Sequence, residues 1–306
     1  MKKIISLLLT IISLFTLCGP VLAYVSQTIE PEEINVASII NIEDQENIDS
    51  YNRSVSAGTA SLTVYLKNST GTTNLSGKIQ LYFESGGYNE YNVGTSGLTL
   101  QGLTVGAKYG INAYVTNYAT DTTFSIIPAT ATTYSKTFNM AQNSSFPTYS
   151  APLSSYTSPG QDQHFGWRNN SGLDYHTGGD ISKDANGNSF GGMTTKPTAK
   201  CVYGGEIYSK AFVSGAGNVV QIKQNTTTTY TTTFYVSYLH LMSYSCGNVG
   251  DAISTGSNIG VVGNTLYKAN IGDPDMGVHL HISVSTSSSI SKTSTSFKDP
   301  KAFSIY

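Results

Sequence analysis

The sequence predicts an all-β protein with two domains. Short runs in which apolar and polar residues alternate, such as SLTVYL and KIQLYF, are separated by clusters of Gly, Asn and Ser, which is typical of strands joined by turns. The chain has 306 residues, of which 39% are hydrophobic, enough for about two domains that each bury a core. A segment rich in Ser and Pro separates two such β-rich regions. We therefore expect an N-terminal β domain, a linker and a C-terminal β domain.

Residues 1–23 have the pattern of a secretory signal peptide. Two lysines precede an apolar run from Ile4 to Cys18, and the residues VLA precede a cleavage position after Ala23. A membrane anchor is the alternative, but the apolar run is short for a spanning helix and Pro20 ends it. The bulky Leu17 disfavours a lipid attached to Cys18. We expect an exported protein with no integral membrane segment after the signal is removed.

Residues 24–54 form an acidic segment, which we expect to be an extended leader or linker. Seven Asp and Glu residues stand there against a single Arg. Across the whole chain only 12% of residues are charged and the formal net charge is −2, which leaves no basic surface for a phosphate backbone. We therefore expect no nucleic-acid partner.

Residues 55–141 are expected to form a small β-sandwich. The runs YGINAYVT and TFSII continue the pattern of short strands separated by turn residues. The stretch QGLTVGAKYGINAYV resembles the closing strands of transthyretin-like or carboxypeptidase-regulatory modules. Because this segment has no His and no Cys, it offers nothing catalytic. A wall-binding module, a spacer and a plain folding unit all remain open.

Residues 142–160 are expected to be a linker, and residues 161–306 a second β domain. The linker contains the Ser- and Pro-rich stretch NSSFPTYSAPLSSYTSPG. In the second domain, GNVVQIKQ and FYVSYLHL flank a Thr-rich turn and predict a β-hairpin. After signal removal two cysteines remain, Cys201 and Cys246, and the sequence leaves open whether they form a disulfide or stay as buried thiols.

All five histidines of the chain lie in residues 161–306, and four of them stand in three short motifs. The first motif is HTGGD, from His176 to Asp180; the second is YLHL, which contains His240. The third is GVHLHIS, in which His279 and His281 are two residues apart. Because side chains of a strand alternate between its faces, these two imidazoles share one face. Imidazoles on one strand face can converge on a metal ion.

Taken in this order, the motifs resemble those of the lysostaphin-type, LytM-like zinc endopeptidases of peptidoglycan. The likeness covers roughly residues 164–302. It includes FGWR before HTGGDIS, then KPTAKCVYGGEI, GNVVQI, YLHL, the glycine-spaced VGDAISTGSNIGVVGNT and a closing DP at Asp299 and Pro300. The resemblance implies an antiparallel β-sheet catalytic domain with an open groove. His164, the fifth histidine, is expected at the surface.

The resemblance also implies a site with one Zn²⁺ ion. His176, Asp180 and His281 would be the metal ligands, and His240 and His279 would be catalytic residues beside the metal. Two imidazoles and one carboxylate leave a position open, which suits a catalytic site, and water bound there would have its pKa lowered toward about 7. The sequence does not tell which of His240 and His279 acts as the general base.

The leading hypothesis is therefore an exported zinc metalloendopeptidase, extracellular or attached to the bacterial cell wall, that acts as a monomer. Its substrate would be a peptide bond in the stems or cross-bridges of peptidoglycan. The loop ISKDANGNSFGGMTTK and the segment GDPDMG depart from the family pattern, so the bond that is cut stays open. Two alternatives are a non-catalytic, wall-binding or regulatory LytM-like protein and a secreted zinc protease that acts on proteins. A zymogen in which residues 24–54 or the linker cover the zinc is also conceivable.

Overall fold

The structure is a computed structural model. It describes residues 58–126, 128, 130–140, 149–160, 163–169, 172–224, 233–269, 271–291, 296–303 and 305–306. All of these residues belong to one compact unit, Ser38–Tyr306. They form strands and turns with two short 3-10 helices, so the predicted all-β class is confirmed. The expected signal peptide and acidic leader, residues 1–54, lie outside the described residues.

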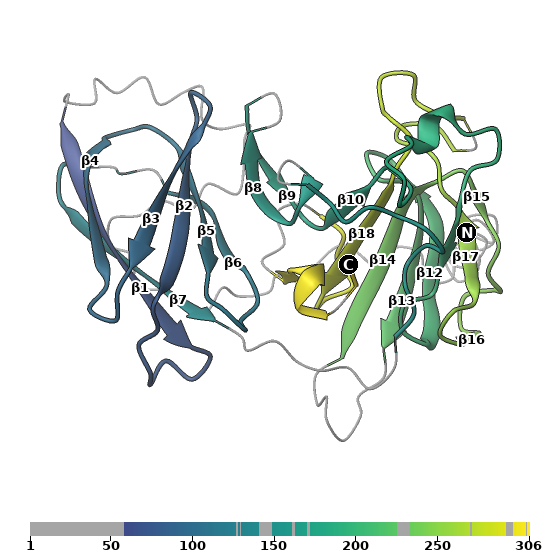
Figure 1. Cartoon of the computed structure of the whole chain (residues 1–306), viewed down its shortest axis with the longest axis horizontal. Helices are drawn as coiled ribbons and strands as arrows, with labels where there is room; N and C mark the ends of the chain where they lie inside the picture. Colours follow the sequence, from purple (N-terminus) through teal and green to yellow (C-terminus); the bar gives the residue numbers. More distant parts are fainter. Residues whose placement is uncertain are drawn as a thin grey trace, which may run out of the picture. The chain divides into compact units, whose positions relative to one another are not determined.

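The first seven strands form two sheets, which we call the N-terminal sandwich, Thr59–Met140 (Figure 1). One sheet has the order β4-β1-β7 and contains β4 (Leu98–Thr104), β1 (Thr59–Asn68) and β7 (Thr133–Met140). The other has the order β3-β2-β5-β6 and contains β3 (Tyr88–Val93), β2 (Gly77–Phe83), β5 (Tyr109–Tyr114) and β6 (Asp121–Ile126). Every second residue of β1 is buried in the shared core, as expected for a strand with one face inward.

A seven-stranded antiparallel sheet forms the centre of the C-terminal domain (Figure 1). Its order is β10-β18-β14-β13-β12-β16, with β19 paired to β18. The strands are β10 (Gly179–Ile181), β18 (Leu280–Ser285), β14 (Phe234–Leu241), β13 (Gly217–Gln224), β12 (Gly205–Val213), β16 (Ala252–Ile253) and β19 (Phe297–Lys298). β13 and β14 pair as the predicted hairpin, although most of its Thr-rich turn lies outside the described residues.

Two small sheets and two 3-10 helices complete the C-terminal domain. One sheet has the order β11-β17-β15, with β11 (Thr198–Lys200), β17 (Asn258–Val261) and β15 (Ser243–Tyr244). The other is the hairpin of β8 (Gly166–Asn169) and β9 (Leu173–His176). The helices are η3 (Phe190–Gly192) and η4 (Pro300–Phe303).

The segment expected to be a linker contributes to the core of the C-terminal domain. Within its described residues, 149–160, Leu153 is 1% exposed and belongs to the same hydrophobic cluster as Leu280 and Ile282 of β18. The backbone N–H of Ser150 donates to the carbonyl of Val202, and that of Thr157 to Lys183. An apolar side chain and backbone hydrogen bonds therefore fix this polar stretch along the domain.

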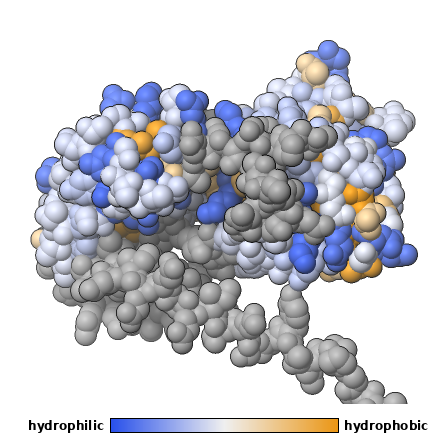
Figure 2. Space-filling view, turned by 90° about the horizontal axis from the view of Figure 1, so that it is seen from below, coloured by the Kyte–Doolittle hydropathy of each residue, from blue (hydrophilic) through white to orange (hydrophobic). Residues whose placement is uncertain are grey.

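The described residues visible on the face shown in Figure 2 are mainly hydrophilic. On the face shown in Figure 2, hydrophobic residues form small separate patches. No helix in the described part of the chain is both long and apolar enough to cross a membrane.

Candidate metal centre

Strand pairing brings together the first and third histidine motifs. β10 and β18 are antiparallel neighbours, and Asp180 lies opposite His281 in their register. Directly opposite residues have Cβ atoms about 4.5–5.5 Å apart, so the two side chains can reach one point. His176 ends β9, and only two residues separate it from β10.

Three side-chain atoms of these motifs form a nearly equilateral triangle. His176 Nε2 lies 3.1 Å from Asp180 Oδ1 and 3.0 Å from His281 Nδ1, which itself lies 2.9 Å from Asp180 Oδ1. The ligands of a tetrahedral zinc ion lie about 2.0–2.1 Å from it, and hence about 3.4 Å from one another. The triangle needs to open by only a few tenths of an ångström. Two imidazole nitrogens and a carboxylate oxygen also suit zinc chemically, so these residues could hold the ion.

The glycine at the centre of HTGGD allows this close packing. A Cβ atom added to Gly178 would lie 2.2 Å from the carbonyl oxygen of Ile282 and 2.8 Å from His281 Nε2. Both distances are shorter than a non-bonded contact, and the first is to backbone. A side chain at this position would therefore push the turn after His176 away from β18.

The imidazoles of His176 and His281 are oriented by hydrogen bonds on their far sides. His176 Nδ1 lies 2.7 Å from the carbonyl oxygen of His164, which can only accept, so Nδ1 carries the hydrogen and Nε2 faces Asp180 and His281. His281 Nε2 lies 3.3 Å from Thr177 Oγ1. Such partners fix the tautomer and the ring orientation of a metal-binding histidine.

Arg168 holds the second oxygen of the Asp180 carboxylate. Its Nη1 donates to Asp180 Oδ2 at 3.3 Å, while its Nε donates to Asp174 Oδ2 at 2.9 Å. Asp180 Oδ1 is thereby left to face the imidazoles. Burial would raise the pKa of Asp180, but the charge of His176 and the hydrogen bonds of His176 and His281 outweigh it and hold that pKa well below its ordinary value.

His240 reaches the site through a β-bulge. Between the pairs Asn218–Leu241 and Val220–Tyr238, β14 has two residues where β13 has only one. His240 is the second of these and has φ of 64°, in the left-handed region that residues with a Cβ seldom occupy. Its ring centre lies 4.8 Å from that of His279 and 5.9 Å from that of His281.

The surroundings of His240 keep it neutral. Burial, followed by the charges of His279 and His281, lowers its pKa to about 3. Its Nδ1 lies 3.0 Å from the carbonyl oxygen of Thr265, so Nδ1 carries the hydrogen. Nε2 is then the nitrogen that can accept a hydrogen bond or a proton.

His279 lies beside the same carboxylate, just before β18. Its Nε2 is 3.6 Å from Asp180 Oδ1, and its Nδ1 is 2.7 Å from the carbonyl oxygen of Gly277. Its side chain is 14% exposed, against 7% for His281. The two histidines therefore lie on the Asp180 side of the strand, as the alternation predicts, while Leu280 belongs to the core.

All five residues singled out in the sequence thus surround one point, and further groups support them. No role is predicted from the sequence for Arg168 or Thr177, although both lie within the motifs FGWR and HTGGD. The supporting carbonyls of His164 and Thr265 leave no sequence signal, because any residue could supply them. His164 itself, expected at the surface, is half-buried.

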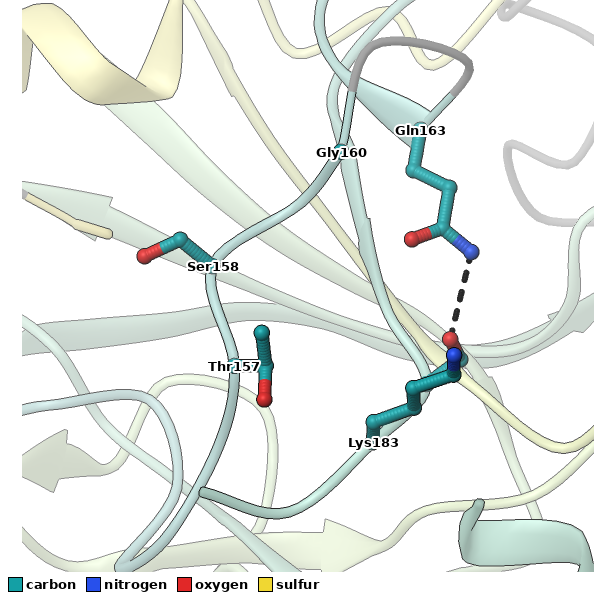
Figure 3. Close-up of a pocket in the computed structure, with 6 residues that line it drawn as sticks. Thr157, Ser158, Gly160, Gln163 and Lys183 are labelled. Carbon is teal, nitrogen blue, oxygen red and sulfur yellow. Dashed lines mark hydrogen bonds between the residues drawn. The ribbon is translucent and has the colours of Figure 1, made fainter. Parts of the chain in front are cut away.

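A pocket with mainly polar lining residues lies beside Ser182 and Lys183, the two residues that follow β10 (Figure 3). Gln163 Nε2 donates to Ser182 Oγ at 3.2 Å across one side of it. The other lining residues are Thr157, Ser158 and Gly160 of the expected linker, together with Lys183. None of the five site residues lines this pocket.

No protein-family model and no curated protein matches the chain. Among solved structures it is similar to lysostaphin, an antimicrobial peptidase from Staphylococcus simulans, with 21% identity over 50% of this chain and 53% of that one and a TM-score of 0.34. A structure from Ruminococcus gnavus assigned as a glycyl-glycine endopeptidase LytM gives 22% identity over 41% and 44%, with a TM-score of 0.31. The catalytic domain of the prophage-encoded protein EnpA from Enterococcus faecalis gives 19% over 49% and 95%, with a TM-score of 0.35. The chain spans about half the length of the first two proteins.

Proposed function

We propose that this chain is an exported bacterial zinc endopeptidase that hydrolyses a peptide bond of cell-wall peptidoglycan. The observation that carries the proposal is the pair of histidines, His240 and His279, beside the triangle of ligand atoms. A structural zinc site is normally closed by a fourth protein ligand, whereas a catalytic site has three and an open position. Two further imidazoles next to three ligands favour a hydrolytic site.

His176, Asp180 and His281 would hold the ion. When bound, zinc supplies a Lewis acid that lowers the pKa of water and polarises a carbonyl group. Arg168 would keep Asp180 Oδ1 directed at the ligand position, because it occupies the other oxygen of that carboxylate. The carbonyl of His164 would do the same for His176 Nε2.

His240 and His279 would handle the proton that hydrolysis moves. In each ring Nδ1 donates to a backbone carbonyl, so Nε2 is the nitrogen available to the substrate side. A neutral Nε2 can accept a hydrogen bond from the attacking water, and a protonated one can donate to the leaving amine. The low pKa of His240 keeps its imidazole neutral, so its Nε2 can accept a hydrogen bond from the water, and the more exposed His279 is better placed to donate to the leaving amine.

The substrate and the location are inferred from the sequence. The order and spacing of HTGGD, YLHL and HLH resemble enzymes that cut peptidoglycan stems or cross-bridges, and residues 1–23 have the pattern of an export signal. We place the protein outside the cell or at the wall, as a monomer.

The decisive experiment incubates residues 24–306, loaded with zinc, with purified peptidoglycan and identifies released products by mass spectrometry. New amino termini are expected, glycine if a cross-bridge is cut and a stem residue if a stem is cut. A zinc-loaded protein that releases none would contradict the proposal. Cleavage of denatured casein without cleavage of peptidoglycan would instead identify a protease of proteins.

A further inference from the structure

The β8–β9 hairpin presents two chemically different faces. In its register Trp167 lies opposite Tyr175, Arg168 opposite Asp174, and Gly166 opposite His176. Alternation therefore places Trp167 and Tyr175 on one face. Arg168 and His176, which contact the other ligands, belong to the opposite face.

The aromatic face packs on the N-terminal sandwich. Phe165, Trp167 and Tyr175 form one buried cluster with Tyr82 of β2 and with Phe297 of β19. Tyr175 Oη lies 2.8 Å from Thr122 Oγ1 of β6, and Trp167 is only 3% exposed. A two-stranded hairpin is marginally stable alone, so this packing is needed to hold it.

Asn112 of β5 binds the backbone of the hairpin at its centre. Its Nδ2 donates to the carbonyl oxygen of Trp167 at 2.9 Å, and its Oδ1 accepts from the N–H of the same residue at 2.8 Å. The amide thus makes both hydrogen bonds that a neighbouring strand would make. Asn112 is completely buried, so losing these bonds would leave polar groups without water.

The surface of the sandwich is shaped to receive Trp167. A Cβ atom added to Gly110 of β5 would lie 2.3 Å from the indole ring. The ammonium group of Lys108 lies over the same ring, 5.9 Å from its centre. These contacts, together with the buried amide of Asn112, make the sandwich and the hairpin complementary in shape where they meet.

We propose that Asn112 is a positioning residue for the metal centre. By fixing the backbone of Trp167, it fixes the next residue, Arg168, which holds Asp180, and the partner strand that ends in His176. The N-terminal sandwich then helps to position the residues of the metal site, in addition to any role as a spacer or wall-binding module. The inference rests on the proposed metal centre, although its first test below needs no metal.

The first test measures amide hydrogen exchange by mass spectrometry on metal-free residues 24–306. In Asn112→Ala, exchange in peptides covering residues 164–181 should be at least tenfold faster, while β13 and β14 keep their protection. Gly94→Ala is the matched control, because a Cβ there meets nothing closer than 3.9 Å. Unchanged exchange in residues 164–181 of Asn112→Ala would overturn the proposal.

The second test titrates the same proteins with Co²⁺ and follows its visible absorption. Asn112→Ala should bind the ion about 10–100-fold more weakly, as expected when support of a metal ligand is lost. Trp167, the single Trp of the chain, reports docking by its fluorescence, which should shift to longer wavelength. A shifted emission with unchanged Co²⁺ affinity would refute the positioning role.

Gly110→Ala provides a second route to the same state if Asn112→Ala fails to fold. It should displace the indole ring without removing any hydrogen-bonding group. Every variant of the two that folds must lose protection in residues 164–181, and a folded variant with unchanged exchange there would contradict the inference. A wild-type protein that binds no metal would contradict the proposed function, whereas the exchange data would still decide the role of Asn112.

Discussion

At the scale of single residues, His240 lies beside the other site residues in an unfavourable backbone conformation. A residue with a Cβ in the left-handed region costs roughly 1–2 kcal/mol relative to ordinary backbone. The bulge imposes this conformation, because β14 has one more residue than β13 between two pairs of the ladder. Strained backbone of this kind is typical of functional positions. The sequence identifies His240 as a candidate but gives no indication of this conformation.

Replacing single histidines should separate metal binding from turnover. His281→Ala removes a proposed zinc ligand, so the zinc content and the activity should both be lost. His240→Ala removes none of the proposed ligands, so it should keep one zinc per chain while kcat falls about 10²–10⁴-fold, the usual contribution of a general acid or base. Zinc is measured by atomic emission and turnover with purified peptidoglycan. Zinc loss in His240→Ala would show that this residue is a ligand.

Replacing Arg168 tests whether its hydrogen bond to Asp180 contributes to zinc affinity. Arg168→Lys keeps the charge but cannot bind Asp174 and Asp180 through separate nitrogens of one planar group. Zinc affinity should fall about 10–100-fold, as measured by competition with a chelating dye. Lys78→Ala, which breaks an exposed ion pair with Glu90 in the sandwich, is the control and should leave affinity unchanged.

At the scale of elements, the turn between β9 and β10 determines how closely Asp180 approaches β18. Gly178→Ala should lower the free energy of unfolding by about 1–3 kcal/mol, the usual cost of forcing extra atoms into a packed site, and should weaken zinc binding. Gly192→Ala in η3, where a Cβ meets nothing within 4 Å, is the matched control. Urea unfolding of both variants measures the difference. Equal midpoints would show that the turn adapts without cost.

Elements with a local sequence pattern are predictable from the sequence. β13 and β14 alternate strongly and flank a turn, so their pairing was predictable. The histidine motifs were recognisable because rare chemical groups recur there at defined spacings. The contact of Asn112 with Trp167 spans 55 residues, and no local pattern records it. The bond from Arg168 to Asp180 likewise depends on the position of the hairpin, which only the folded chain specifies.

At the scale of the whole molecule, carboxyl groups buried between distant segments make stability depend on pH. Asp299 precedes η4 and is 8% exposed. Lys301 donates its backbone N–H to this carboxylate at 2.9 Å, and Thr120, which follows β5 in the sandwich, also forms a hydrogen bond with it. Burial nevertheless raises the pKa of Asp299 above its ordinary value of 3.8. The folded protein therefore binds this proton more tightly than the unfolded chain does.

The sign of the resulting pH dependence follows from the thermodynamic coupling between proton binding and folding. A carboxyl group with a raised folded-state pKa favours the fold while it is protonated, and this contribution is lost as pH rises from 3.8 through the folded-state pKa. Asp299→Asn cannot lose a proton, so its stability relative to wild type should increase as pH rises through that window. Urea unfolding of both proteins at a series of pH values from 4 to 7 gives the difference directly. Taking the difference cancels carboxyl groups with lowered pKa, such as Asp184, which act in the opposite direction in both proteins. A difference that decreases with pH would show that the hydrogen bonds from Lys301 and Thr120 outweigh burial.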